Sequence, residues 1–270
     1  MKLELTLQGK LGEFGFDLEL SLPLAGIVGL FGPSGVGKTS LFRALCGLER
    51  ELPGRILLDG EVLQDSATET FVLPERRRIG VVFQDSRLFP HLTVRQNLKL
   101  ARRQSMNPLF GIEELAEACR FTELLDQPAP ALSAGQRQRV AIARALAASP
   151  RLLLLDEPLA ALDLSSRQHL MGFLEEVSAR IPMIFISHSV SETLHLCDPI
   201  ITMSSGRIER IGSPETMGQY LPRRRGHGRV VRYDADSGEL VLQLDEFAPD
   251  FQPRQTVGLV SDPAWLKGRG

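Results

Sequence analysis

The sequence predicts an α/β fold whose central sheet is mostly parallel. Two short runs, 152–155 and 183–186, are apolar throughout, and helical patterns lie before and after them. Strands of a parallel sheet are covered by helices on both faces, which makes them uniformly apolar rather than alternating. In addition, four apolar runs each end in a polar residue, as expected where parallel strands deliver side chains to one edge of a sheet.

The amino-terminal part of the chain adds strands of another kind. Residues 3–7 and 14–20 alternate apolar and polar side chains, so we expect two antiparallel strands with one buried face. Residues 55–63 are expected to form a hairpin that turns at an Asp-Gly pair, a dipeptide that favours tight turns. The apolar run 26–31 predicts a buried strand that leads into a Gly-rich loop.

The remaining elements follow from periodicity and composition. One helix is expected at about 38–48, and another is expected to start near Asp163. Residues 93–126 carry helical periodicity and much charge without a strand-like run, so they predict a helical insert. The Pro/Arg/Gly-rich stretch 222–228 predicts a linker, and two strand-like runs are expected around 234–238.

Composition argues against several classes of protein. Of the 270 residues, 43% are hydrophobic and 24% charged, as in ordinary globular proteins, and the net charge of −2 argues against a nucleic-acid-binding surface. The three cysteines form no Cys-x-x-Cys pair, so we expect reduced, buried thiols. No signal peptide is apparent, and no apolar run approaches the ~20 residues that cross a bilayer, so any membrane role is expected to be peripheral.

A complete phosphate-binding motif follows the strand expected at 26–31. The segment GPSGVGKT fits G-x-x-x-x-G-K-[ST] and lies between a strand and a helix, the context in which this motif binds phosphate. Lys38 is expected to reach the β- and γ-phosphates, and the Thr39 hydroxyl is expected to bind Mg²⁺. The expected nucleotide-binding residues of this segment are Gly32, Pro33, Ser34, Gly35, Val36, Gly37, Lys38, Thr39 and Ser40.

Further polar residues follow the other apolar runs. Gln84, the pair Asp156-Glu157 and His188 each stand at the end of an expected strand. Asp156 is expected to hold Mg²⁺, and Glu157 to accept a proton from the attacking water. Gln84 is expected to position that water or to complete the metal shell, and His188 to bind the γ-phosphate and steady Glu157. A single Gln or His at such a place is often structural, but their joint placement favours function.

Several motifs carry a family resemblance. Leu132-Ser-Ala-Gly-Gln136 resembles the signature LSGGQ of the ABC transporter ATPases, and residues 156–163 resemble their Walker B and D-loop run. Gln84 and His188 match the family's Q-loop and switch histidine. The resemblance implies a P-loop NTPase, in which a RecA-like core carries an antiparallel β subdomain and a helical subdomain.

The resemblance also implies the organisation of the chain. An ABC ATPase domain is expected at 1–222, with its helical subdomain at about 85–150. Residues 223–270 are expected to form a linker and a short β-rich extension. Molybdate-importing members of the family typically carry a longer tail with an oxyanion-binding β domain, so we expect this chain to lack a complete regulatory domain of that kind.

A head-to-tail dimer is a further implication of the resemblance. In this family the signature helix contacts the γ-phosphate of the ATP that the other subunit holds, so Ser133, Gly135 and Gln136 are expected to bind a second copy's nucleotide. Two copies would enclose two ATP molecules, with Asp163 lying across the interface. Ala134 stands in place of a signature glycine and disfavours positive φ, so we expect the site to survive and turnover to be the property open to change.

The expected ligands are ATP and Mg²⁺. An aromatic residue near the amino terminus usually stacks on adenine in this family, and Phe14 is the first candidate. Phe16 is the alternative, and because the two share a strand face, one or both could instead belong to the core.

Some stretches are closer to one subfamily. Residues 73–78, 82–91 and 187–192 resemble the ATP-binding subunit of molybdate importers. This implies ATP hydrolysis that energises uptake of molybdate or a related oxyanion, with sulfate, iron or polyamine as alternative solutes. The implied partners are a transmembrane permease and, indirectly, a solute-binding protein, at the cytoplasmic face of the inner membrane. Contacts with the permease are expected from Arg87, Leu88, Phe89 and His91, unless these form an ordinary solvated loop.

Three other function classes compete with transport. A regulatory protein that holds ATP without cleaving it is disfavoured by the presence of Glu157 and His188. A kinase or GTPase is disfavoured because the sequence has no Asn-Lys-x-Asp segment for reading guanine. A soluble ABC ATPase that acts on ribosomes or DNA is the third alternative. Such proteins usually carry two ATPase halves or long coiled-coil insertions, and neither is apparent here.

Overall fold

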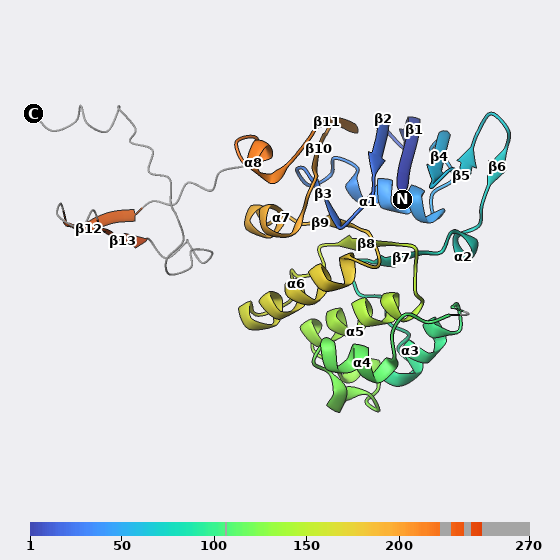
Figure 1. Cartoon of the computed structure of the whole chain (residues 1–270). Helices are drawn as coiled ribbons and strands as arrows, with labels where there is room; N and C mark the ends of the chain where they lie inside the picture. Colours follow the sequence, from blue (N-terminus) through green and yellow to red (C-terminus); the bar gives the residue numbers. More distant parts are fainter. Residues whose placement is uncertain (106, 222–227, 235–238, 245–270) are drawn as a thin grey trace, which may run out of the picture. The chain divides into compact units, whose positions relative to one another are not determined.

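The computed structural model of the protein describes residues 1–105, 107–221, 228–234 and 239–244 (Figure 1). The chain divides into two compact units, Met1–Pro222 and Arg223–Gly270. In the smaller unit the structure describes a hairpin of β12 (Gly228–Asp234) and β13 (Glu239–Leu244). The larger unit is built on one mixed sheet of eleven strands, which confirms the predicted α/β fold.

The parallel part of this sheet consists of five strands, in which every neighbouring pair is parallel. Their carboxyl ends therefore face one edge, as the sequence predicted. In spatial order the strands are β7 (Ile79–Val82), β8 (Leu152–Asp156), β9 (Met183–Ile186), β3 (Ile27–Phe31) and β10 (Ile200–Ser204).

The uniformly apolar strands serve two cores at once. In β8, Leu153 and Leu155 belong to the core cluster on one face of the sheet, whereas Leu152 and Leu154 belong to the cluster on the other face. Side chains alternate between faces along a strand, so a strand covered on both sides must be apolar at every position. This arrangement explains why these runs were recognisable in the sequence.

A second part, in which all neighbouring strands but one pair are antiparallel, extends the same sheet. The predicted alternation of the first two strands is confirmed, since Leu5 pairs with Leu20 and both are buried. β4 and β5 form the predicted hairpin. The strands of this part are β11 (Arg207–Gly212), β2 (Phe14–Pro23), β1 (Lys2–Leu11), β4 (Gly54–Leu58), β5 (Glu61–Asp65) and β6 (Thr70–Phe71).

Helices cover both faces of the sheet (Figure 1). α1 packs into the core cluster shared with β1 and β2, while α3, α4, α5 and α6 pack into the other cluster. The helical segment expected at 93–126 contains α3, α4 and a short 3₁₀ turn, a second such turn follows it at Ala129–Ala131, and both helices pack on α5. The long helices are α1 (Lys38–Cys46), α3 (Val94–Arg102), α4 (Ile112–Ala118), α5 (Ala134–Ala147), α6 (Leu164–Ser178) and α7 (Val190–Leu196).

Two expectations about the larger unit can be compared with its structure. The helix expected to reach Leu48 ends at Cys46, because Gly47 adopts a φ of 75° and caps it. Cys46, Cys119 and Cys197 are all buried and free, as predicted. Within the described part of the chain, none of the helices combines the length and the apolar character that crossing a bilayer requires.

The short helix α2 (Pro74–Arg77) places a fully buried arginine against the end of α1. Arg77 Nη1 donates to the carbonyl oxygens of Ala44 and Leu45 at 2.7 and 2.9 Å. Its Nη2 and Nε donate to the carbonyl oxygens of Leu63 and Val72 at 3.2 and 2.8 Å. Burial lowers the pKa of Arg77 to about 10, which leaves it charged at neutral pH. The guanidinium therefore caps α1 and ties it to the antiparallel strands.

Arg77→Met is expected to lower the free energy of unfolding by about 3 kcal/mol, because it removes a buried charged donor from four carbonyl oxygens, of which those of Ala44 and Leu63 keep a backbone N–H partner. Urea unfolding of the purified chain measures this change. Arg76→Met, at an exposed position in the same helix, is the matched control and should change the free energy by less than about 0.5 kcal/mol. Equal effects of the two substitutions would contradict the capping role.

Candidate active site

The phosphate loop, residues 32–37, connects β3 to α1 and is packed too tightly for side chains at two of its glycines. A Cβ at Gly37 would lie 2.4 Å from the ring of Phe16. A Cβ at Gly32 would lie 2.4 Å from the carbonyl oxygen of Met203. Gly37 also has a φ of 98°, in the left-handed region that other residues avoid. The sequence of the loop is therefore dictated by its backbone.

Lys38 begins α1 and is almost fully buried by the loop. Its Nζ donates to the carbonyl oxygens of Gly32 and Pro33, both at 2.8 Å. Burial lowers the pKa of Lys38, while the carboxylates of Glu157 and Asp156 act in the opposite direction. Because Gly37 offers no side chain to cap α1, the helix terminus and the ammonium group together form an anion-binding position.

Strand β8 ends in the predicted acid pair. Asp156 is 6% exposed and accepts a hydrogen bond from the Thr39 hydroxyl at 2.8 Å. Glu157 has a φ of 51°, a strained value for a residue with a side chain, and strain of this kind concentrates at functional sites. The two adjacent carboxylates make different contacts and can therefore serve different purposes.

The Glu157 carboxylate joins the ends of two neighbouring strands. His188 Nε2 lies 2.8 Å from Glu157 Oε1, and Gln84 Nε2 donates to Glu157 Oε2 at 3.5 Å. Gln84 and His188 are both exposed, while Glu157 is partly buried. A carboxylate held in this way, with an imidazole and an amide beside it, can accept a proton from a water molecule.

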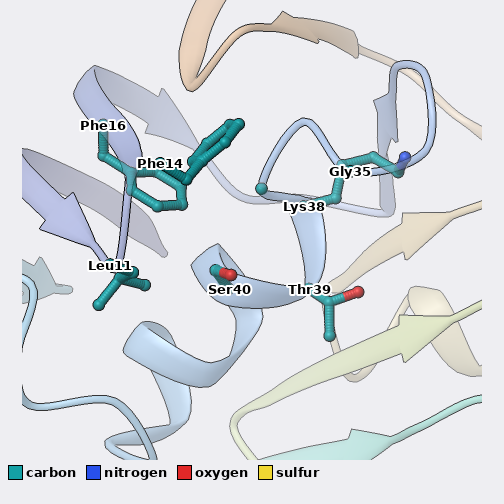
Figure 2. A pocket seen from close by; sticks show the side chains of 8 residues that line it. Leu11, Phe14, Phe16, Gly35, Lys38, Thr39 and Ser40 are labelled. Atoms are coloured by element: carbon teal, nitrogen blue, oxygen red, sulfur yellow. The ribbon is translucent and has the colours of Figure 1, made fainter.

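A hollow of about 300 Å³ lies beside the phosphate loop. Figure 2 shows the side chains that line it. Phe14 and Phe16 line it from β2, and their ring centroids are 4.9 Å apart. Phe16 is only 4% exposed and packs against Gly37, so it belongs to the core. Phe14 is partly exposed and is the ring left to face a ligand. The other residues lining the hollow are Leu11, Gly35, Gly37, Lys38, Thr39 and Ser40.

Leu11 is a member of this hollow that sequence reasoning missed. It ends β1 and pairs with Phe14 across the hairpin. The available signal was its place opposite the aromatic candidate, but the length of the hairpin could not be fixed from the alternation alone. Of the other motif residues, Val36 is buried in a core cluster, whereas Ser34 is exposed.

The signature segment forms the start of α5. Ser133 caps the helix: its hydroxyl accepts from the Gln136 N–H at 3.2 Å, and Gln136 Oε1 accepts from the Ser133 N–H at 2.8 Å. The helix begins at Ala134. As the first helical residue, Ala134 has no positive φ, so the penalty expected for alanine does not arise. Ser133 and Ala134 are exposed.

The described contacts connect some predicted site residues and leave others apart. One chain of contacts joins Gln84, Glu157 and His188, and another joins Thr39 to Asp156. Asp163 is exposed and caps α6 by accepting from the Ser166 N–H at 2.9 Å. Among the described residues, no hydrogen bond or ion pair links Asp163 or the signature segment to the phosphate loop.

The loop after Gln84 has an unusual backbone. Ser86 and Arg87 both have positive φ, of 59° and 43°. Beyond them, Phe89 is 42% exposed, and its ring contacts Arg144 and His91. The side chains expected to meet a permease are therefore mostly exposed, with Leu88 as the partly buried exception.

The sequence profile described as ABC transporter matches residues 16–160, which hold both the phosphate loop and the signature segment. The chain belongs to the ABC transporter family. The predicted motifs follow β3, β7, β8 and β9 and begin α5, elements that Figure 1 labels. The family and the fold were thus identified correctly from the sequence.

Within this family, the chain is similar to proteins of one kind. The chain is 45% identical over 215 residues to the molybdenum import ATP-binding protein ModC of Salmonella typhi, covering 79% of this chain and 60% of the relative. It is 42% identical over 229 residues to ModC of Escherichia coli (strain K12), covering 82% and 64%. The chain thus spans less than two thirds of the length of these relatives.

A solved structure shows the same fold in a dimer. The dimeric post-hydrolysis state of the ATP-binding cassette MJ0796, bound to ADP and Pi, superposes with a TM-score of 0.64 at 27% identity. The match covers 79% of this chain and 98% of that one. The ABC ATPase fold of the larger unit is therefore shared with a nucleotide-bound protein.

Proposed function

We propose that the chain is the ATP-hydrolysing subunit of an ABC importer, and that its solute is molybdate or a related oxyanion. The observation that carries the proposal is the set of contacts made by two adjacent acids. The Glu157 carboxylate contacts His188 and Gln84. The preceding residue, Asp156, accepts a hydrogen bond from the Thr39 hydroxyl. The identity with ModC proteins, named for molybdenum import, supports the choice of solute.

In this proposal each strand end has one task. Lys38 and the start of α1 bind the β- and γ-phosphates of ATP, so Lys38 exchanges its carbonyl partners for phosphate oxygens. Glu157 accepts the proton of the attacking water, and Gln84 orients that water. His188 holds Glu157 in place and donates to the γ-phosphate.

The residues around Thr39 fit a magnesium site. The Thr39 hydroxyl and the Asp156 carboxylate are hard oxygen donors that already lie 2.8 Å apart. Mg²⁺ is usually held by one or two protein oxygens, substrate phosphates and water, so a pair of this kind is sufficient. Bound there with ATP, Mg²⁺ would neutralise phosphate charge, and Gln84 would be a further ligand.

The proposed active form is a head-to-tail dimer. Ser133 and Asp163 are exposed and lie in no described contact with the phosphate loop of their own subunit, which leaves them available to a second copy. The dimeric structure of the ATP-binding cassette MJ0796 supports this arrangement. Ser133, Gly135 and Gln136 then bind the partner's γ-phosphate, and ATP favours the closed dimer because it contacts both copies only there.

The proposed place of work is the cytoplasmic face of the inner membrane. Import requires a path across the bilayer, and no helix in the described residues can provide one. A permease is therefore the proposed partner, and a solute-binding protein that delivers the solute to the permease is the proposed indirect partner. The exposed Phe89 and its neighbours Arg87, Leu88 and His91 are the proposed contacts with the permease.

The proposal can be tested by co-expressing the chain with a permease whose gene lies next to its own. We expect the two proteins to copurify and ATP hydrolysis to rise when the permease and its solute-binding protein carry molybdate. Stimulation by sulfate, iron or polyamine instead would correct the solute. Sedimentation with ribosomes or DNA, without a permease, would favour the soluble alternative.

Phe14→Ala is expected to weaken ATP binding by about fivefold or more, since stacking of a base on an aromatic ring contributes about 1–3 kcal/mol. Titration calorimetry with the Glu157→Gln protein measures affinity without turnover. Inorganic triphosphate separates base stacking from phosphate binding, because its affinity should not change. Phe14→Trp should retain ATP affinity, and a loss of triphosphate binding in Phe14→Ala would contradict the assignment.

A further inference from the structure

A buried carboxylate lies behind the turn that carries His188. Glu192, in the first turn of α7, is 7% exposed. Its Oε2 accepts from the Ser187 hydroxyl at 2.5 Å, and the Ser189 N–H donates to the same hydroxyl oxygen at 3.0 Å. Since His188 stands between these two serines, the network fixes the backbone from which its imidazole extends.

The same carboxylate faces an arginine from α6. Arg167 Nη1 lies 3.5 Å from Glu192 Oε1, and Arg167 Nη2 donates to the carbonyl oxygen of Leu162 at 3.4 Å. Both distances are at the long end of the range for hydrogen bonds. Arg167 Nε is buried and has no acceptor among the described residues. The guanidinium is therefore shared between two partners.

Leu162 belongs to the turn 160–163, which follows the acid pair and packs against the signature segment. The Ala160 N–H donates to the carbonyl oxygen of Glu157 at 3.3 Å. A Cβ at Gly135 would lie 3.1 Å from the carbonyl oxygen of Ala161 and 3.3 Å from Leu162 Cδ2. A shift at the start of α5 would therefore reach the carbonyl group that Arg167 binds.

We propose that Arg167 and Glu192 are positioning residues that connect the turn 160–163 to the turn that carries His188. The proposal rests on the proposed ATPase function and deepens it. When the signature segment of a subunit binds the partner's nucleotide, the turn moves against Gly135, and the guanidinium transfers this movement to Glu192 and Ser187. Through this connection Arg167 and Glu192 keep His188 at its 2.8 Å distance from Glu157 while the signature segment is engaged.

The first test is steady-state ATP hydrolysis by the full chain. Arg167→Met is expected to lower kcat about tenfold while KM and the affinity for a non-hydrolysable ATP analogue change less than about twofold. Glu192→Gln should show the same pattern. Arg180→Met is the matched control, since it also removes an arginine that donates to a carbonyl oxygen, that of Leu109 at 3.2 Å, and it should alter neither quantity.

The second test asks whether Arg167 acts through His188. In a His188→Ala background, Arg167→Met should cause less than about twofold further loss of kcat, because nothing remains to be positioned. If Arg167→Met does not fold, Arg167→Lys can replace it, because lysine keeps the positive charge but lacks the planar, two-branched guanidinium. It should show a smaller loss of kcat in the wild-type background and no further loss in the His188→Ala background. Equal losses in the two backgrounds, or an unchanged kcat for Arg167→Met, would overturn the proposal.

The third test does not depend on activity. Nitrogen-15 NMR of the histidine side chains should show a shifted His188 signal in Arg167→Met and an unshifted one in Arg180→Met. An unshifted His188 signal in both variants would overturn the proposal even if the protein proved inactive. A wild-type chain that hydrolyses no ATP would overturn the proposed function instead, so the two failures are distinguishable.

Discussion

Glu157→Gln is expected to lower kcat for ATP hydrolysis at least about 100-fold while leaving ATP bound. The substitution keeps the shape of the side chain and its contacts with Gln84 and His188, but an amide cannot accept the proton of the attacking water. In the proposed head-to-tail dimer, ATP that is not hydrolysed continues to hold the two copies together, so the variant should accumulate as an ATP-bound dimer. Phosphate release and size-exclusion chromatography with ATP measure the two effects.

Glu176→Gln provides the control for this experiment. It makes the same chemical change at an exposed position on α6 and should hydrolyse ATP as the unaltered chain does. Normal turnover by Glu157→Gln would show that another group serves as the base, and the proposed role of the acid pair would have to be abandoned.

Lys38→Ala is expected to weaken ATP binding at least about tenfold or to reduce turnover at least about 100-fold. Lys38 is the buried cation of the phosphate loop, and burial lowers its pKa because the charge lacks water. Phosphate oxygens of ATP would replace the missing water around the ammonium group, so the interaction between Lys38 and ATP should be strong. Calorimetry with ATP and a phosphate-release assay separate binding from chemistry.

Lys99→Ala, at an exposed position on α3, is the matched substitution and should leave both measurements unchanged. An active Lys38→Ala protein with ordinary ATP affinity would contradict the phosphate-loop assignment. It would leave the fold and the family unaffected, since these depend on the whole of the larger unit.

The strands that hold the site could be predicted because their signal is local. Runs such as 152–155 are apolar at every position, and each is followed directly by its polar residue. The phosphate loop was recognisable for a related reason, since its glycines are imposed by close packing at Gly32 and Gly37. In both places the structural requirement acts on a few consecutive residues, and a sequence records such requirements clearly.

Other features depend on contacts between distant segments and could not be predicted. β10 and β11 were missed because their patterns are short and mixed, and their place in the sheet is set by neighbours far along the chain. The choice between Phe14 and Phe16 was open because both lie on one face of β2. Only the packing of Phe16 against Gly37 separates them. The role of Arg77 likewise depends on four carbonyl groups from three other segments.

The alternation of β8 between the two cores has a consequence for the chemistry at its end. Successive side chains of the strand point to opposite faces of the sheet, so the face to which Asp156 points is set by its position in this alternation. Deleting one leucine from 152–155 would conserve the composition of the strand but shift that position by one residue. The Asp156 carboxylate would then point to the opposite face of the sheet and lose its contact with the Thr39 hydroxyl. The position of this carboxylate therefore depends on the length of the strand as well as on its apolar character.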